Sequence, residues 1–414
     1  KYIWVFSRER VELVMRQNIR ITPEGTRDLL FEECLARREA ESLLADLFVC
    51  HGFSEVMTPG LEFFDVFQAG HPAIPAESMY KLTDSKGRLL VMRPDSTLPI
   101  ARLTATRLRQ AALPIRLYYA QDVYHLNHSL SGRNDQEFQA GVELIGTGGQ
   151  RADLEILSLA ADVLRLPCIG GDFRLEIGHI GFFQSLVEEL EVGEEVRDEI
   201  RTLIETKNYA ALSDLLDSLP KSGAAEALRR LPRLFGGEEI LREAGPLCHK
   251  EQSRAALGHL AWLYRSLQAL GLGDQVMIDL GLVHRNEYYT GVIFRGYMEG
   301  SGDTVVSGGR YDTLLQQFGS PLPATGFGVN VDAVIKGMLD KGQVEPPMLP
   351  EALVFAEDGC EAAALDKVRT LTEGGILTEF SLQETRGEAL RYARERGIPL
   401  VYVVSAGGED RVEV

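Results

Sequence analysis

One strand-like segment, residues 135–146, constrains this chain more than any other part of its sequence. With the two-residue period of a β-strand, its apolar side chains share one face: Phe138, Ala140, Val142 and Leu144. Gln139, Gly141 and Glu143 share the other face, which offers an amide, an open position and a carboxylate in a row. Such a strand is typical of a sheet floor that holds a small polar ligand. A half-exposed antiparallel strand with its polar face in water has the same pattern.

The composition restricts the class of protein. The chain has 414 residues, 45% of them hydrophobic and 25% charged, which is typical of a soluble globular protein with two or three domains. No apolar run approaches the roughly 20 residues that span a bilayer, and residues 1–16 lack the apolar core of a signal peptide. Five scattered cysteines without a Cys-x-x-Cys pair predict reduced thiols and no zinc site. We therefore expect a cytoplasmic protein without a membrane anchor, metal or cofactor.

The net charge of −18 bears on the partners that the chain can bind. A negative protein is repelled at long range by nucleic acid unless a local basic patch overrides the repulsion. The sequence contains no dense run of Lys and Arg. A role in binding tRNA is therefore not expected, although the charge alone does not exclude RNA.

Hydrophobic periodicity divides the chain into six segments. They are an N-terminal extension, either native or left over from cloning (1–18), the first part of an α+β core (19–180), a helical insertion (181–272), the second part of the core (273–340), a proline-rich linker (341–350) and a small α/β unit (351–414). The strand–helix alternation of the last segment predicts a parallel sheet.

Within the core, several elements follow from local patterns. Leucines near helical spacing predict a helix over residues 28–50, and a polar loop joins two long strands, 115–127 and 135–145, in a hairpin. The pair Gly308-Gly309 predicts a tight turn between a strand and a helix over residues 311–318.

The segment Arg93–Thr97 places a carboxylate and two hydroxyls where a strand turns into a helix. Asp95 is suited to bind an ammonium group, and Thr97 to add a hydrogen bond. The competing interpretation is a helix cap with a salt bridge from Arg93. On these residues alone, the cap is the favoured interpretation.

A tyrosine pair enters a predicted strand over residues 288–297. Tyr289 and Gly291 share a face of that strand, and a phenol there can hydrogen-bond an imidazole or an amine. Core packing of two aromatic residues with high β-propensity explains the pair equally simply. The glycine-rich segment Ser307–Asp312 lacks the spacing and the lysine of a phosphate loop, so it is either a seat for a ligand's edge or a turn.

Taken in order, these segments resemble the class II catalytic core of the histidyl-tRNA synthetases. The matching parts are the opening segment (22–28), the amino-acid-binding turn (93–97), the second class motif (118–146), two histidine-specific segments (287–291 and 308–312) and the third class motif (326–332). The resemblance covers about residues 19–338. It implies an α+β fold with an antiparallel sheet flanked by helices, a helical insertion, and a shortened anticodon-binding α/β domain at the end.

The resemblance also implies a set of histidine-binding residues: Asp95, Thr97, Gln139, Glu143, Tyr288, Tyr289 and Tyr311. In that set Asp95, Thr97 and Gln139 hold the amino group, and Glu143 and Tyr289 hold the imidazole. Tyr311 closes the pocket. A buried carboxylate opposite an imidazole discriminates well, because other amino acids would leave it unpaired.

Three positions depart from the synthetase pattern. The motif-two arginine is replaced by His125 and the motif-three arginine by Ala333, while the catalytic arginine of the first histidine-specific segment falls on His284. Arginine binds phosphate through a planar, bidentate set of donors that a neutral histidine or an alanine cannot replace. We therefore expect no catalytic residues and no adenylate formation.

A histidine pocket without the ATP arginines resembles the regulatory subunits of ATP phosphoribosyltransferase, a family of synthetase paralogues. This implies a non-catalytic protein of histidine biosynthesis that activates a short-form catalytic subunit and binds free histidine for feedback inhibition. It also implies a homodimer within a hetero-oligomer. The alternatives are an active or divergent histidyl-tRNA synthetase, or a paralogue with another histidine-dependent role, and the C-terminal α/β unit keeps them open.

Overall fold

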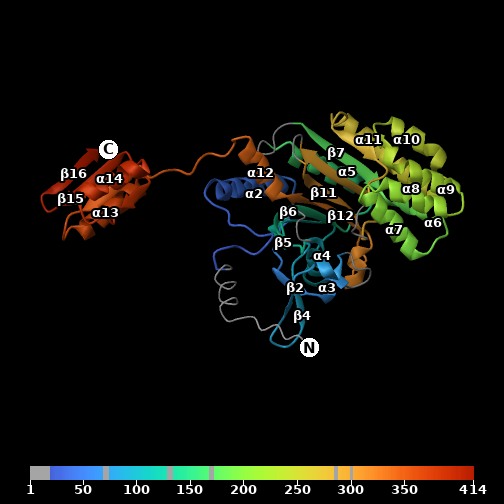
Figure 1. Ribbon diagram of the computed structural model, residues 1–414, viewed down its shortest axis with the longest axis horizontal. Helices are drawn as coiled ribbons and strands as arrows, with labels where there is room; N and C mark the ends of the chain where they lie inside the picture. Colours follow the sequence, from blue (N-terminus) through green and yellow to red (C-terminus); the bar gives the residue numbers. More distant parts are fainter. Residues whose placement is uncertain (1–18, 69–73, 128–133, 167–171, 284–287, 299–301) are drawn as a thin grey trace, which may run out of the picture. The chain divides into compact units, whose positions relative to one another are not determined.

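The computed structural model describes residues 19–68, 74–127, 134–166, 172–283, 288–298 and 302–414 (Figure 1). The chain forms two compact units, Lys1–Val344 and Glu345–Val414. The boundary between them falls inside the predicted proline-rich linker. In the described residues, no helix is long and apolar enough to cross a membrane.

The larger unit is built on a nine-stranded sheet in the order β1-β5-β6-β12-β11-β10-β7-β9-β8. In that order the strands are Ser54–Glu55, Ile115–Tyr124, Gln136–Ile145, Ala324–Asn330, Thr304–Arg310, Val292–Met298, Phe173–His179, Val276–Asp279 and Phe235–Gly236. The central pairs from β5 to β7 are antiparallel, as the resemblance implied. The pairs β1–β5 and β7–β9 are parallel, so the sheet as a whole is mixed.

Helices cover the apolar face of the central strands. In Figure 1, α2 (Glu32–Cys50) and α12 (Val331–Asp340) lie side by side, and α5 (Gln150–Leu164) follows along the same sheet. The ring of Phe48 in α2 contacts Tyr118 and Phe327, with centroid distances of 5.8 and 6.1 Å. The predicted start of α2 at residue 28 is four residues early, and its buried stripe runs through Ala36 and Ala40 to Phe48. The small alanines let this helix pack closely.

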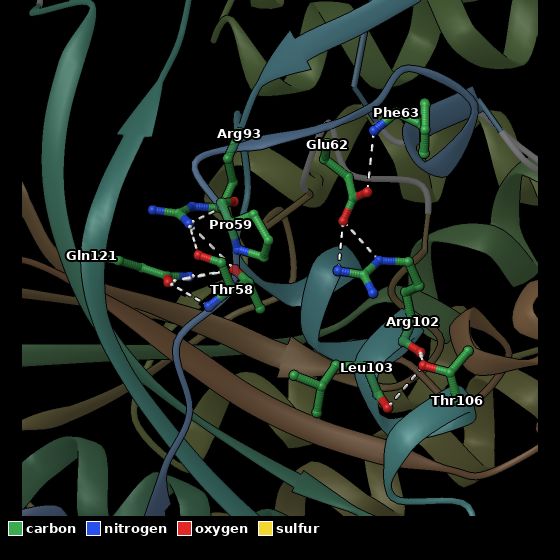
Figure 2. A network of polar contacts seen from close by, with 9 residues as sticks. All are labelled: Thr58, Pro59, Glu62, Phe63, Arg93, Arg102, Leu103, Thr106 and Gln121. Carbon is green, nitrogen blue, oxygen red and sulfur yellow. Dashed lines mark hydrogen bonds and ion pairs between the residues drawn. The ribbon is translucent and has the colours of Figure 1, made fainter.

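The opposite, polar face of the sheet meets α4 (Thr97–Arg107) and a small three-stranded sheet in the order β2-β4-β3. These strands are Leu61–Phe63, Leu89–Met92 and Lys81–Thr83, and α3 (Asp65–Gln68) and a 3-10 turn (Ala76–Ser78) lie near them in the sequence. Glu62, buried on the inner side of β2, pairs with Arg102 of α4 at 2.6 Å, as Figure 2 shows. This ion pair ties the small sheet to α4.

The predicted helical insertion forms one end of the larger unit (Figure 1). It contains α6 (Ile180–Glu188), α7 (Glu194–Glu205), α8 (Tyr209–Ser218), α9 (Gly223–Arg230), α10 (Glu239–Ala244), α11 (Glu251–Ala269) and 3-10 turns at Leu231–Arg233 and Gly245–Leu247. The prediction was almost wholly helical, but the two-residue strand β8 from this segment pairs with β9 at the edge of the large sheet. The insertion is thus joined to the sheet by backbone hydrogen bonds as well as by side-chain packing.

The C-terminal unit has a four-stranded sheet in the order β14-β13-β15-β16. The strands are Thr378–Phe380, Ala352–Ala356, Leu400–Ser405 and Gly408–Glu413, with α13 (Glu361–Glu373) and α14 (Arg386–Arg396). The first three strands are parallel, as predicted, and the helices contribute to two separate apolar clusters. The antiparallel strand β16 was missed, because its residues are mostly polar and exposed.

Three predictions near the polar face were wrong in detail. Strand β10 begins at Val292, so the tyrosine pair at 288–289 precedes the strand. Gly308 and Gly309 lie inside β11 and form no turn. The helix expected over residues 311–318 is a 3-10 segment, Leu314–Phe318. The glycines mark close approach of neighbouring groups to the strand, and a turn has the same sequence signal.

Candidate functional site

The floor of the site is the face of the central sheet opposite α2 and α12. In register across three strands, Glu143 of β6 pairs with Gly326 of β12, which pairs with Gly309 of β11. Gln139 and Glu143 lie on this face, because their neighbours Phe138 and Val142 lie on the helix-covered face. The alternation predicted from the sequence is therefore correct.

The glycines of this floor are occupied by the protein's own side chains. A Cβ atom at Gly141 would lie 2.6 Å from the Tyr119 hydroxyl, and one at Gly309 would lie 2.8 Å from Tyr289 Cδ1. A Cβ at Gly326 would overlap the Glu143 carboxyl. The position at Gly141 that the sequence left open is thus filled by Tyr119, which sequence reasoning missed.

Glu143 is the central acidic group of the site. It is 2% exposed, and the Tyr311 hydroxyl donates a hydrogen bond to it. The pKa of Glu143 is raised to about 8, chiefly by burial; hydrogen bonds from Tyr311 and Thr97 oppose the rise, and the Asp95 charge adds to it. Without a ligand, Glu143 is therefore mostly protonated at neutral pH.

Asp95 stands just before the first turn of α4. Its Oδ1 accepts a hydrogen bond from the Leu98 amide at 2.9 Å, as the cap interpretation predicted. Burial raises the pKa of Asp95 to about 6. The predicted salt bridge from Arg93 is replaced, because that guanidinium donates to the Thr58 and Pro59 carbonyls at 2.7 and 3.0 Å (Figure 2). The Asp95 carboxyl is therefore held by the backbone amides of Leu98 and Thr97 and not by Arg93.

A buried hydrogen-bond network fixes the start of α4 on the sheet. The side-chain amide of Gln121 in β5 donates to the Ser96 hydroxyl at 3.0 Å, and its oxygen accepts from the Thr58 amide at 3.2 Å. Figure 2 shows Gln121, Thr58 and Arg93 converging from separate elements. This arrangement holds Asp95 and Thr97 in place over the floor, and the contribution of Gln121 was not predicted.

Tyrosines form the wall of the site. The rings of Tyr288 and Tyr289 are 4.7 Å apart, and Tyr288 meets Tyr311 at 5.7 Å in an edge-to-face contact. Burial raises the pKa of each of these phenols, so they stay neutral and able to donate hydrogen bonds. On the floor, the Tyr119 hydroxyl donates to Gln139 Oε1 at 2.8 Å. The structure brings the predicted set together: Asp95, Thr97, Gln139, Glu143, Tyr288, Tyr289 and Tyr311.

Behind Tyr311, a buried ion pair anchors the end of β11. Arg310 is 5% exposed, and its guanidinium donates to Asp153 of α5 at 2.8 Å and to Asp312 at 2.9 Å. The other Asp153 oxygen lies 3.2 Å from His259 Nε2 in α11. Gly291 lies against this arginine, since a Cβ there would be 2.9 Å from Arg310 Cδ. The glycine thus serves core packing and not a ligand.

Two of the three replaced arginine positions lie away from Glu143, at the end of the β5–β6 hairpin where the loop joins the two strands. His125 follows β5, and its amide donates to the Asp135 carbonyl at 2.8 Å. Burial lowers the pKa of His125, so it is neutral. The Tyr80 hydroxyl and the Asn127 amide donate to the Asp135 carboxyl. Ala333 lies in the first turn of α12, and His284 lies outside the described residues.

The arrangement suits a small ligand that carries cationic or proton-sharing groups. Burial disfavours the charged forms of Asp95 and Glu143 and so raises their pKa values. A ligand with a cationic or proton-donating group stabilises a buried carboxylate by pairing with it. In the described residues, no group of His, Cys, Asp and Glu has the geometry of a metal site.

Comparison with known proteins agrees with this geometry. A family model for histidyl-tRNA synthetase matches residues 25–334. A protein of Clostridium kluyveri named ATP phosphoribosyltransferase regulatory subunit is 38% identical over 92% of this chain and 98% of its own length. A Bacillus cereus protein of the same name is 36% identical over 95% of this chain and 93% of its own. The chain belongs to the ATP phosphoribosyltransferase regulatory subunit family.

Solved structures support the membership of this family. A Bacillus halodurans protein described as an ATP phosphoribosyltransferase regulatory subunit/histidyl-tRNA synthetase has a TM-score of 0.80 and 30% identity. The match covers 93% of this chain and 99% of that one. A histidyl-tRNA synthetase from Nostoc, with a TM-score of 0.72 and 19% identity over 95% and 96% of the two chains, shares the fold. The predicted fold class and family are confirmed.

Proposed function

We propose that this protein is a non-catalytic subunit that activates a short-form ATP phosphoribosyltransferase catalytic subunit and confers feedback inhibition by free histidine. The family membership supports a catalytic partner, since the relatives are named regulatory subunits. The observation that carries the histidine part is the buried Glu143, hydrogen-bonded by Tyr311 and facing Asp95 across one site. A homodimer within a hetero-oligomer is part of this proposal.

In the bound state, Asp95 and Thr97 hold the ammonium group of histidine, and Glu143 and Tyr289 hold the imidazole. Tyr288 and Tyr311 pack around the ring. An imidazole shares one proton with Glu143 and so satisfies a carboxyl group that burial otherwise isolates. An amino acid with an apolar side chain leaves that carboxyl unpaired, which is how the site selects histidine.

The loop end of the hairpin, around His125, argues against adenylate formation. A triphosphate needs cationic donors, but the two described replacements are a neutral His125 and Ala333. The carboxyl of Asp135 beside His125 adds negative charge at the same place. Loss of one such charge-stabilising donor typically costs on the order of a hundredfold or more in rate.

Histidine regulates by shifting a conformational equilibrium of the complex. A ligand that binds an inactive arrangement more tightly than an active one moves the population toward the inactive form. The shift is limited by the difference between the two affinities, so the tight fit of Glu143 and the tyrosines has to exist mainly in the inactive arrangement.

The test is an assay of phosphoribosyl-ATP formation by a short-form catalytic subunit from the same source, with and without this protein. We expect stimulation by the protein and suppression of that stimulation by histidine. The variant Glu143→Gln should still stimulate but should lose the suppression by histidine. Absence of any effect on the catalytic subunit would contradict the proposal. Histidine-dependent ATP–pyrophosphate exchange would instead support an active histidyl-tRNA synthetase.

A further inference from the structure

The site described above has partners for two of the three polar groups of histidine. Free histidine also carries a carboxylate, and a carboxylate needs N–H or O–H donors, best supplied with a positive charge. The carboxylate of Asp95 repels it, and the Glu143 carboxyl is already assigned to the imidazole. A place for the ligand carboxylate therefore has to be sought along the floor, away from both acids.

A second row of residues runs across the floor beside the Glu143 row. In register from β5 to β10, its members are Tyr119, Gly141, Gly328, Ser307 and Arg295. Directly paired residues on neighbouring strands have side chains on the same face, about 5 Å apart. Tyr119 covers Gly141, and its hydroxyl lies 3.3 Å from the Cβ position of Gly328. The row thus begins at Tyr119, crosses two glycines without side chains, and ends at the hydroxyl of Ser307 and the guanidinium of Arg295.

Gln139 is oriented toward this row. Its Oε1 accepts the Tyr119 hydrogen bond at 2.8 Å, and its Nε2 lies 3.0 Å from the Cβ position of Gly328. The amide therefore presents a donor above Gly328, next to Ser307. An N–H donor suits a carboxylate, so this orientation favours the ligand carboxylate as the partner of Gln139, in place of the amino group that the resemblance implied.

Arg295, paired with Ser307 in register, adds a positive charge to this row. Its side chain is partly exposed, and Nη2 donates to the Val283 carbonyl at 3.2 Å. Its charge weakly opposes the rise that burial causes in the pKa of Tyr289, so the guanidinium lies within electrostatic range of the tyrosine wall. A guanidinium has five N–H donors, so its bonds to the Val283 carbonyl and to the Tyr297 hydroxyl leave others for a ligand. The acidic neighbours Glu176 and Asp279 have pKa values raised by burial, which weakens their competition.

We propose that the carboxylate of the ligand lies above Ser307, where it accepts hydrogen bonds from Gln139 Nε2, the Ser307 hydroxyl and the Arg295 guanidinium. This assignment rests on the proposed binding of histidine and adds the requirement for an α-carboxylate. It makes Arg295 and Ser307 specificity-determining residues. It predicts that the site distinguishes histidine from histamine, the same molecule without the carboxylate.

The experiment measures Kd values of L-histidine and histamine by titration calorimetry for the full chain and its variants. Hydrogen bonds to charged groups contribute about 1.5–3 kcal/mol, so Arg295→Gln should weaken histidine binding roughly 10- to 100-fold. It should leave histamine binding unchanged within about twofold. Ser307→Ala leaves the hydrogen bond from Arg295 to the Val283 carbonyl intact and should weaken histidine binding roughly three- to tenfold. Arg295→Lys keeps the positive charge and should therefore weaken histidine binding less than Arg295→Gln.

The matched control is Arg174→Gln, an exposed arginine of β7 whose guanidinium donates to the Asp274 carbonyl. It should change neither Kd, and thermal unfolding confirms that each variant is folded. If Arg295→Gln and Ser307→Ala leave the ratio of the two Kd values unchanged, the carboxylate assignment is wrong while histidine binding stands. If the unmodified protein binds no histidine at millimolar concentrations, the proposed function fails and the assignment falls with it.

Discussion

The two ends of the β5–β6 hairpin differ in what they offer a ligand. Around Glu143, buried carboxyl groups face neutral tyrosines that come from three separate segments. Around His125, the polar groups are already paired with one another, through Asp135, Tyr80 and Asn127. At the first end a ligand can pair with the buried carboxyl groups, whereas at the second end the polar groups already pair with one another. A single sheet can thus carry one cluster that suits a ligand and another whose polar groups satisfy one another.

The largest effect is expected behind the first end, where Asp153 neutralises Arg310. Removing one partner of a buried ion pair leaves the other charge uncompensated and typically costs about 3–5 kcal/mol. We expect Asp153→Ala to lower the free energy of unfolding by about that amount in urea denaturation, and to weaken histidine binding by displacing Tyr311. The exposed pair Arg229–Asp217 serves as the control. Asp217→Ala should cost less than about 1 kcal/mol. Equal losses would show that the buried pair has no special role.

The next effect tests the central acid itself. Glu143→Gln keeps the shape of the side chain but cannot share a proton with an imidazole as a carboxylate. We expect the Kd of histidine to rise about 100-fold, the upper range for a hydrogen bond to a charged group. The exposed Glu199 of α7 provides a control, since Glu199→Gln should leave the Kd unchanged. A Glu143→Gln variant that still binds histidine normally would contradict the assigned imidazole partner.

The pH dependence of histidine binding follows from the same carboxyl. Free imidazole titrates at about pH 6.5 and Glu143 at about pH 8. Between these values the imidazole is neutral and Glu143 is protonated, so the pair holds the one proton that its hydrogen bond needs. Below that window a proton has to leave on binding, and Asp95, with a pKa of about 6, begins to lose its charge. Above it a proton has to be taken up. We expect affinity to peak within the window and fall up to tenfold per pH unit on either side, measured by calorimetry. Glu143→Gln should remove the alkaline decline.

Without ligand, Glu143 makes the folded protein less stable as the pH rises, whereas a carboxyl group with a lowered pKa makes it more stable. Glu143 binds its proton more tightly in the folded chain than in the unfolded one. Its contribution to stability is therefore complete at acidic pH and declines as the pH rises toward 8. Thermal unfolding with and without Glu143→Gln isolates this contribution, and a pH profile that is identical in the two proteins would contradict the raised pKa.

The smallest effect is expected at the loop end of the hairpin, around His125 and Asp135. Tyr80→Phe removes the hydrogen bond to Asp135 and should cost about 1 kcal/mol of stability. The Kd of histidine should stay within about twofold of the unmodified value, because no contact links Tyr80 to the Glu143 cluster among the hydrogen bonds of the described residues. A large change in histidine binding would show that the two ends are coupled, and the comparison between them would fail.

The sequence predicted the floor of the site better than its surroundings. Strand alternation placed Gln139 and Glu143 correctly, because the face of a residue depends only on its own strand. It could not show that Tyr119 fills the gap at Gly141, since that contact depends on the register between β5 and β6. For the same reason Gly308 and Gly309 were taken for a turn. A single strand does not reveal which neighbour approaches its glycines.

The polar partners were the hardest to predict. Arg93 was expected to bind the nearby Asp95, but its donors reach the carbonyls of Thr58 and Pro59, more than 30 residues away in the sequence. Arg310 and Asp153 are likewise joined across 157 positions. Long-range pairs of this kind leave no periodic signal in the sequence. The resemblance to a family supplied the site residues that periodicity alone left undecided.

The glycine floor also limits how such a protein can change over evolutionary time. A methyl group at Gly141, Gly309 or Gly326 would strike a side chain that forms the site, so these positions tolerate almost no substitution. The side chains that stand on them face no such restriction. A descendant that sensed another metabolite would have to exchange Tyr119, Glu143 or Tyr289 while inheriting the floor unaltered. The bare backbone is the durable part of the proposed histidine site, and the specificity of that site is carried by residues that can be replaced one at a time.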